Sequence, residues 1–417
     1  MFSLYHLQYF FQDVQLFFVK MSQIRNIVSL TEISDGGMMI ARGDFMSHWT
    51  TIWAQAHTDL HMIRSYLRGK TARTTIPVCA AGSKLRLRFS NREGRSYFVL
   101  RDATVCVGEK TYTLTFGGQP SLTLAPGKAA YCDEIECNIT AGEAVSITTF
   151  YSRTATSGNQ VRESTIYSTK GNFVHGDFVL GKAIIPRYRI VGIPPIVGLD
   201  AVEILTEEKP AIIACLGDSI TQQSHWVHPL NQTFFLRGSA VRALNLGIGG
   251  NRVLSGDCSG VGIFGRAALE RFREDVLDRP GVTAVIFAIG TNDIGKIVTE
   301  EDFEKNSAAN IFAGLKSMAD EAANHGMKVY FATITPRLGS AFYDQRQEAI
   351  RLELNKLLRK ASADYAGLID FDAALNGART GIMPTDCDSG DHLHPGPMGG
   401  LRMAKEALRV LDETLAL

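Results

Sequence analysis

The sequence predicts an α/β protein in which a three-layer α/β/α domain with a parallel sheet, of the flavodoxin-like kind, follows an N-terminal β-rich domain. Two observations lead to this fold class. Apolar runs alternate with helical segments after residue 206, as in a parallel sheet buried on both faces. Before residue 206, short strand-like segments are separated by turns that contain Gly or Asn, which is typical of an antiparallel sandwich.

The length of 417 residues exceeds what one ordinary core supports, so two domains are expected. The periodicity changes at Thr206–Pro210 (TEEKP). We therefore predict an N-terminal extension over 1–20, a β-rich sandwich-like accessory domain over 21–206 and an α/β/α domain over 207–417.

The β-rich domain is predicted from segments that alternate or carry β-branched and aromatic residues: Lys84–Phe89, Tyr97–Leu100 and Ala144–Tyr151. The segments AAGS, SNREG, PGKA, TAGE and TSGN are expected to be the turns between strands.

The parallel sheet is predicted from five apolar runs, at Ala211–Leu216, Ala243–Leu246, Ala284–Ile289, Val329–Ile334 and Leu368–Phe371. Candidate helices lie near 265–279, 301–325, 343–361 and 398–413. Ligands of such sheets gather at the carboxyl ends of the strands.

The first twenty residues are rich in Phe, Leu and Tyr, but polar residues interrupt them and no basic n-region or cleavage site is present. This argues against a secretory signal. Two interpretations stay open: Met21 is the biological start, or the segment is an amphipathic helix that packs on the body.

Composition excludes several classes of function. Lys+Arg and Asp+Glu number 43 each, without a basic stripe, which disfavours a nucleic-acid binder. No run of about 20 apolar residues predicts a membrane span. Seven scattered cysteines without a CxxC pair indicate reduced thiols rather than a zinc site, although a bridge between Cys258 and Cys387 stays open. A cytoplasmic location is favoured, and a secreted one is the alternative.

Polar, glycine-containing motifs follow the predicted strands. The first strand leads into GDSIT with Ser219, the second into GIGGN with Gly250, and the third into GTND with Asn292. After the last strand, DHLHP contains Asp391 and His394. Packing alone does not explain such a series, so a site is expected where these strand ends meet.

These residue types fit nucleophilic acyl chemistry. A serine hydroxyl needs an adjacent base, and Ser219 with His394, oriented by Asp391, supplies a nucleophile, a base and an orienting carboxylate. Backbone N–H groups at Ser219 and Gly250 and the Asn292 amide are candidate oxyanion donors. The absence of a Gly-x-Ser-x-Gly elbow around Ser219 argues against the α/β-hydrolase fold. No pattern in the sequence predicts a metal or other cofactor.

The motifs GDSIT, NLGIGGN, GTND and DHLHP resemble blocks I, II, III and V of the SGNH (GDSL-like) hydrolase superfamily. The segments 265–295 and 388–395 further resemble a bacterial subgroup with a β-rich N-terminal domain. The resemblance implies the same triad and oxyanion donors, with Gly249 as the neighbouring alternative to Gly250.

Three further residues are candidates for substrate binding. Gln222 and Gln223 stand where many members of the superfamily have an acidic or small residue followed by Gly, and Gln222 is expected at the pocket rim. His392 is a rim residue and a second candidate base. Trp226 either lines the pocket or anchors the helix after the first strand.

The sequence therefore predicts a serine ester hydrolase whose substrate is a small-molecule or glycan ester, with removal of acetyl groups from carbohydrate favoured by the resemblance. A lysophospholipase or thioesterase, a glycan-binding protein with a non-catalytic scaffold, and an acyltransferase are the alternatives. The sequence does not determine the oligomeric state.

Overall fold

The structure is a computed structural model, and it describes residues 46–61, 70–151, 156–161, 164–168, 195–257, 260, 262–295, 297, 299–341, 343–376 and 380–415. Residues 46–417 form one compact unit. The N-terminal extension predicted over 1–20 and the choice between Met1 and Met21 lie outside the described residues.

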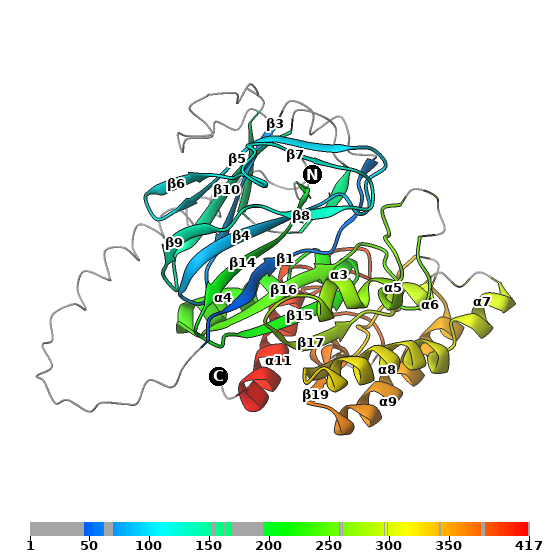
Figure 1. Ribbon diagram of the computed structural model, residues 1–417. Coiled ribbons are helices and arrows are strands. Elements are labelled where there is room, and N and C mark those ends of the chain that lie inside the picture. Colours follow the sequence, from blue (N-terminus) through cyan, green and yellow to red (C-terminus); the bar gives the residue numbers. More distant parts are fainter. Residues whose placement is uncertain are drawn as a thin grey trace, which may run out of the picture. The chain divides into compact units, whose positions relative to one another are not determined.

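A parallel sheet forms the centre of the C-terminal half (Figure 1). Its strand order is β16-β15-β17-β18-β19, and every neighbouring pair is parallel. In chain order this is 2-1-3-4-5, the flavodoxin-like order, in which the direction of winding reverses between the first and third strands. The strands are β15 (Ala211–Gly217), β16 (Val241–Gly247), β17 (Val282–Ala288), β18 (Lys328–Ala332) and β19 (Gly367–Ile369).

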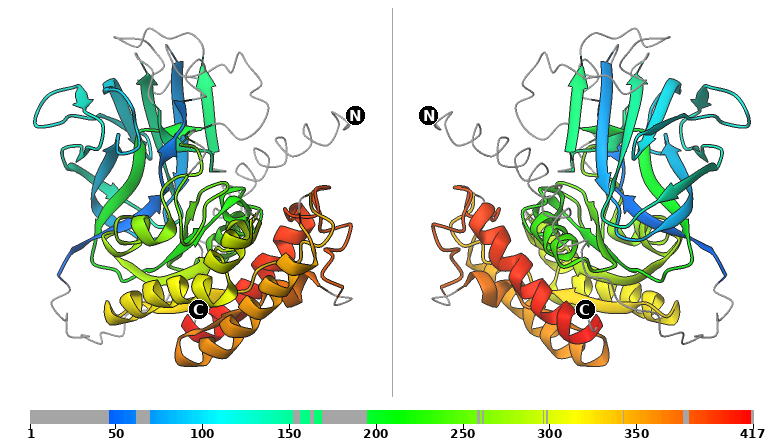
Figure 2. Two further views of the ribbon diagram at one scale, coloured as in Figure 1. Left: turned by 90° about the vertical axis from the view of Figure 1, so that its right-hand side faces the viewer. Right: turned by 90° about the vertical axis from the view of Figure 1, so that its left-hand side faces the viewer.

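Helices cover both faces of this sheet, which explains why its strands are almost continuously apolar. One face packs on α5 (Ala268–Phe272), α8 (Ala308–Asn324) and α9 (Gln345–Ala361). The other face packs on α4 (Val227–Arg237), α10 (Phe371–Leu375) and α11 (Pro397–Leu415), and α8, α9 and α11 are the long helices in Figure 2. The remaining helical segments are α3 (Ser219–Gln222), η2 (Arg273–Leu277), α6 (Thr291–Gly295), α7 (Glu300–Lys305) and η3 (Ser362–Asp364).

The preceding part of the chain is β-rich and its paired strands are antiparallel. One sheet has the order β1-β14-β4-β8 with β9 beside β4, a second has β12-β3-β10-β5-β6 with β7 beside β5, and a third has β13-β11-β2. The first two sheets contribute to one shared hydrophobic cluster. The strands are β1 (His48–Ala54), β2 (Thr58–Asp59), β3 (Lys70–Pro77), β4 (Gly82–Ser90), β5 (Phe98–Val107), β6 (Lys110–Thr113), β7 (Leu122–Leu124), β8 (Ala129–Tyr131), β9 (Ile135–Ile139), β10 (Ala144–Tyr151), β11 (Ser157–Asn159), β12 (Ser164–Ser168), β13 (Ile196–Val197) and β14 (Leu199–Thr206). The β-rich prediction is confirmed, while the sandwich arrangement and the boundary at 206 remain predictions.

The β-rich region also contacts the parallel sheet directly. Gln55 forms a parallel bridge with Asn245 of β16, so the chain after β1 pairs with the edge strand of that sheet. The Thr51 N–H donates to the Pro280 carbonyl at 2.8 Å. The buried carboxylate of Asp200 lies 3.4 Å from the buried guanidinium of Arg279. These contacts hold the β-rich strands against β16 and against the turn that precedes β17.

All five predicted parallel strands are present, with ends that differ by a few residues. The helix predicted over 301–325 is instead two helices. Ser307 starts α8 by accepting a hydrogen bond from the Asn310 N–H, and a capping box at Thr299 starts α7. None of the helices in the described parts of the chain is both long and apolar enough to cross a bilayer.

Candidate active site

Ser219 lies at the carboxyl end of β15, where the strand turns into α3. The Asp218 carboxylate caps this short helix by accepting a hydrogen bond from the Ile220 N–H at 3.0 Å, as expected for a turn-forming Asp. Gly217 allows the turn because a Cβ there would lie 2.1 Å from Thr221 Oγ1. The backbone therefore presents a half-buried serine at the switch point of the sheet.

The structure brings Ser219, His394 and Asp391 together. Ser219 Oγ lies 2.8 Å from His394 Nε2, and His394 Nδ1 lies 2.6 Å from Asp391 Oδ2. Asp391 Oδ1 accepts hydrogen bonds from the N–H groups of Leu393 and His394. Partial burial raises the pKa of Asp391, but the hydrogen bonds from His394 and these N–H groups outweigh it and hold the pKa at about 2. The Asp391 carboxylate is therefore charged at neutral pH and can orient the His394 imidazole.

The two proposed oxyanion residues come from the ends of β16 and β17. Gly250 has a φ of +73°, and a Cβ at this position would lie 2.3 Å from the Phe264 ring. Asn292, in α6, donates from Nδ2 to the Asn251 carbonyl at 3.1 Å. The amide of Asn292 is therefore held beside the turn that contains Gly250.

Sequence reasoning missed Arg271, a fully buried arginine in α5. Its guanidinium donates to the Gly217 carbonyl at the end of β15 and to the Leu246 carbonyl at the end of β16, both at 3.0 Å. It also donates to Asn251 Oδ1 at 3.0 Å and to Asp275 Oδ2 at 2.9 Å. A residue that binds both strand ends fixes their relative position. No motif in the sequence distinguishes it from the other arginines of its segment.

The three predicted substrate-binding residues have different positions. Trp226 is fully buried and packs edge-on against Phe371, a position that fits the helix-anchoring alternative, and its role in substrate binding remains a prediction. Gln222 is only half-buried, and its amide hydrogen-bonds Asn159 of the β-rich region at 2.6 Å.

His392 is exposed, as a rim residue should be, and has the unusual φ of +59° for a residue other than Gly. Its Nδ1 lies 2.6 Å from Asp388 Oδ2. This pair repeats the pairing of His394 with Asp391 two residues earlier, yet the hydrogen bond to Ser219 is made by His394.

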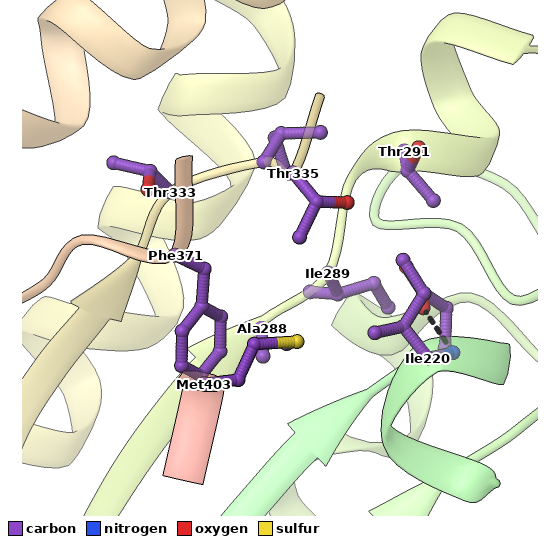
Figure 3. A pocket seen from close by; sticks show the side chains of 10 residues that line it. Ile220, Ala288, Ile289, Thr291, Thr333, Thr335, Phe371 and Met403 are labelled. Atoms are coloured by element: carbon purple, nitrogen blue, oxygen red, sulfur yellow. Dashed lines mark hydrogen bonds between the residues drawn. The ribbon is translucent and has the colours of Figure 1, made fainter. Parts of the chain in front are cut away.

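A small cavity of about 20 Å³ lies next to the nucleophile turn, between the ends of β15, β17 and β18. Its wall combines apolar side chains with threonines, and Figure 3 shows Ile220, Ile289, Phe371 and Met403 around it, with Thr333 and Thr335 above. Asp218 also lines the cavity, and its burial raises the pKa of this carboxyl to about 6. The cavity has room for about one water or methyl group.

Within the described residues, no group of three or more His, Cys, Asp or Glu side chains could hold a metal ion. Cys387 is a buried free thiol, and Cys258, its suggested partner, lies outside the described residues.

The described geometry defines an α/β protein with a Ser–His–Asp hydrogen-bonded chain at the carboxyl edge of a parallel sheet. Residues 215–400 match the sequence profile of the GDSL-like lipase/acylhydrolase family. The chain thus contains a GDSL-like lipase/acylhydrolase domain over these residues.

The solved structures that are similar to the chain align with about half of it. A variant of Axe2, an acetyl xylan esterase from Geobacillus stearothermophilus, is 19% identical, with 49% of this chain and 97% of that chain aligned at a TM-score of 0.39. The acetyl xylan esterase AlAXEase is 17% identical over 48% of this chain and 99% of its own, with a TM-score of 0.38. LAE5, an alpha/beta hydrolase enzyme from the metagenome of Lake Arreo, Spain, is 20% identical over 48% and 94%, with a TM-score of 0.36. No curated protein matches the chain.

Proposed function

We propose that this protein is a serine ester hydrolase that works through an acyl-enzyme, with Ser219 as nucleophile, His394 as general base and Asp391 as the orienting carboxylate. The observation that carries the proposal is the unbroken chain of hydrogen bonds from Ser219 Oγ to His394 Nε2 at 2.8 Å and from His394 Nδ1 to Asp391 Oδ2 at 2.6 Å. These contacts are within the range that proton transfer between a nucleophile and its base requires.

The charged Asp391 accepts a hydrogen bond from the Nδ1–H of His394 and so leaves the lone pair of Nε2 facing Ser219. As Oγ attacks the ester carbonyl carbon, its proton passes to Nε2, and the carbonyl oxygen becomes an oxyanion. Collapse of this intermediate breaks the ester bond, and the alcohol departs with the proton from Nε2. Water then attacks the acyl-enzyme and gives one proton to His394. His394 passes this proton to Ser219 Oγ as the bond between Oγ and the acyl carbon breaks, which releases the carboxylic acid and regenerates the serine hydroxyl.

The acyl group is proposed to be short, most simply acetyl, on the family resemblance of the sequence motifs. The small cavity beside the nucleophile turn does not bear on this choice, because neither Ser219 nor His394 lines it. The alcohol portion is proposed to be carbohydrate, on the resemblance of segments 265–295 and 388–395 to a subgroup with a β-rich domain. Fold alone does not determine that portion.

The test measures hydrolysis of p-nitrophenyl acetate, butyrate and octanoate, together with acetate release from acetylated xylan. The wild type is expected to prefer the acetate ester. Ser219→Ala should lower kcat by about a million-fold, to the assay floor, because the remaining triad has no nucleophile to activate. Ser239→Ala is the matched control, since Ser239 lies just before β16 at the opposite edge of the sheet and should keep full activity.

Activity that survives Ser219→Ala, or a wild type that cleaves none of these esters, would overturn the proposal. If the wild type prefers octanoate, the triad assignment would stand but the short acyl group would not. A lysophospholipase or thioesterase would then be favoured. Binding of xylan without turnover would favour the glycan-binding alternative.

A further inference from the structure

One side chain of the β-rich region, Asn159, contacts both the end of β16 and α3, the short helix that begins at Ser219. Asn159 ends the three-residue strand β11 and is fully buried. Its backbone neighbours are strands of the β-rich region, because β11 pairs with β13 and β2. Its side chain, in contrast, contacts Gly247 at the end of β16 and Gln222 at the end of α3. Asn159 therefore joins two parts of the chain that are far apart in sequence.

The carboxamide of Asn159 uses its full hydrogen-bonding capacity. Nδ2 donates to the Gly247 carbonyl and to the Ala56 carbonyl, both at 2.8 Å. Oδ1 accepts from Gln222 Nε2 at 2.6 Å and from the Gln160 N–H at 2.8 Å. A carboxamide has two donor hydrogens and two acceptor lone pairs, so no capacity is left over. Because two of its partners are carbonyl oxygens, only one orientation of this amide satisfies the network.

One of these bonds fixes the peptide that begins the Gly250 turn. The Gly247 carbonyl accepts from Asn159, and the N–H of the same peptide, at Ile248, donates to the Gly217 carbonyl at 3.1 Å. Gly217 precedes the nucleophile by two residues. The peptide between Gly247 and Ile248 is thus held from both sides, by Asn159 on one side and by the Gly217 carbonyl of β15 on the other.

The second bond acts through Gln222. Its amide nitrogen is held by Asn159, and its Oε1 lies against Gly249, where a Cβ would be only 2.8 Å away. The Gln222 side chain therefore supports Gly249 and, through it, the neighbouring Gly250. Gln222 itself is the last residue of α3, the helix that begins at Ser219.

We infer that Asn159 is a positioning residue for the oxyanion site: acting through Gly247 and Gln222, it sets the place of the Gly249–Gly250 turn relative to Ser219. This inference rests on the proposed function. It assigns the β-rich region a part in forming the catalytic centre, beyond covering the edge of the parallel sheet. An oxyanion donor must lie at hydrogen-bond distance from the developing charge, so a small shift of this turn lowers the rate of the chemical step more than it weakens substrate binding.

The experiment compares Asn159→Ala and Asn159→Asp with the wild type on p-nitrophenyl acetate. Asp has the size of Asn but presents an oxygen to the carbonyls of Gly247 and Ala56. Asn159→Asp therefore removes the two donors without removing volume, whereas Asn159→Ala removes both. Both variants are expected to lower kcat by about 10- to 100-fold and to change KM by less than about threefold, a smaller loss than removal of an oxyanion donor itself. Gln222→Ala should produce part of the same loss of kcat, and Gln223→Ala should not.

Asn91 provides a matched control for stability. It is also a buried Asn of the β-rich region, and its Nδ2 donates to the carbonyls of Ser96 and Leu124 at 2.8 and 2.9 Å. Asn91→Ala is expected to lower Tm by a similar amount while kcat stays within twofold of wild type. The inference is wrong if the Asn159 variants lower Tm as Asn91→Ala does and leave kcat unchanged, or if they change KM alone.

A readout without turnover separates this inference from the proposed function. Hydrogen exchange of the amides in 247–251 should become at least tenfold faster in Asn159→Ala and stay unchanged in Asn91→Ala. If the wild type cleaves no ester but this exchange pattern is seen, the proposed function fails and the positioning of the turn stands. If exchange in 247–251 is the same in both variants, the positioning role is excluded.

Discussion

At the scale of single residues, Gly250 shows how a backbone conformation and a lack of space select the same amino acid. Its φ of +73° lies in the left-handed region, which costs other residues roughly 1–2 kcal/mol. Its missing side chain also leaves room for the Phe264 ring. Gly238 is a useful counterpart, because it has a φ of +66° at the C-cap of α4 and nothing within 4 Å of the place of a Cβ.

We predict that Gly250→Ala lowers kcat on p-nitrophenyl acetate by about 10- to 100-fold, because the methyl group forces the turn or the Phe264 ring to move away from its place. Gly238→Ala meets the same cost of backbone conformation without a steric clash, so it should lose about 1 kcal/mol of unfolding free energy and no activity. Equal kcat values for Gly250→Ala and Gly238→Ala would show that the turn at Gly250 can move without loss of activity, and would contradict the prediction.

Asp218 predicts a pH dependence of stability. Burial raises the pKa of Asp218 in the folded protein to about 6, above the value near 3.9 of an unfolded chain. Between about pH 4 and pH 6 the folded state therefore holds a proton that the unfolded state has lost, and the unfolding free energy falls as pH rises through this window, by at most about 3 kcal/mol.

Asp218→Asn should remove this component while its side-chain oxygen still caps α3. The measurement is urea unfolding of wild type and variant at pH 4, 5, 6 and 7. The wild type should lose more stability than the variant between pH 4 and pH 6. The comparison isolates Asp218 from Asp293, whose pKa burial also raises to about 6. Parallel pH profiles would contradict the prediction.

At the scale of elements, α5 holds together the two strands that precede Ser219 and Gly250. Arg271 donates to Gly217, the last residue of β15, to Leu246, the last but one of β16, and to Asp275, all within the buried interior. A lysine in this place has a single ammonium group and cannot reproduce the planar fork of donors. The helix would then no longer join β15 to β16 through one side chain.

We predict that Arg271→Lys lowers the unfolding free energy by about 3 kcal/mol, because buried carbonyl and carboxylate oxygens lose their partners. The neighbouring Arg273 is more than half exposed and pairs with Glu321 on the surface, so Arg273→Lys should change stability by less than about 0.5 kcal/mol. Chemical denaturation of both variants tests this, and equal stabilities would refute the assigned role of Arg271.

The elements also show what the sequence can and cannot predict. The parallel strands were predictable because burial on both faces makes them continuously apolar, and the motifs were predictable because their polar residues follow those strands directly. The segment TSGN was expected to be a turn, but its last three residues form β11. Its pairing with β2 and β13, and the contacts of Asn159 with Gly247 and Gln222, depend on residues that are distant in sequence, for which a local pattern carries no signal.

At the scale of the whole molecule, the β-rich strands are part of what makes the parallel sheet stable. The bridge between Gln55 and Asn245 covers the edge at β16, and Asp200 neutralises the buried Arg279. Without these partners, a sheet edge would be open to other chains, and Arg279 would be left with the more distant carboxylate of Asp275, at 3.9 Å.

We therefore predict that residues 207–417 alone are insoluble or have a Tm lower by more than about 10 °C than the full chain, since each kcal/mol lost corresponds to about 2–4 °C in a domain of this size. Thermal unfolding and light scattering of the two proteins test this. A monodisperse fragment with the Tm of the full chain would show that the parallel sheet needs no support from the β-rich strands.

The pairing of β1 with β14 has a consequence for how the protein is made. His48 is paired with Thr206, so the first described strand to leave the ribosome waits for a partner that is synthesised about 150 residues later. Such a high contact order slows folding and leaves an unpaired strand exposed during synthesis. A holding chaperone that covers β1 until β14 has been made should therefore raise the yield of the soluble protein.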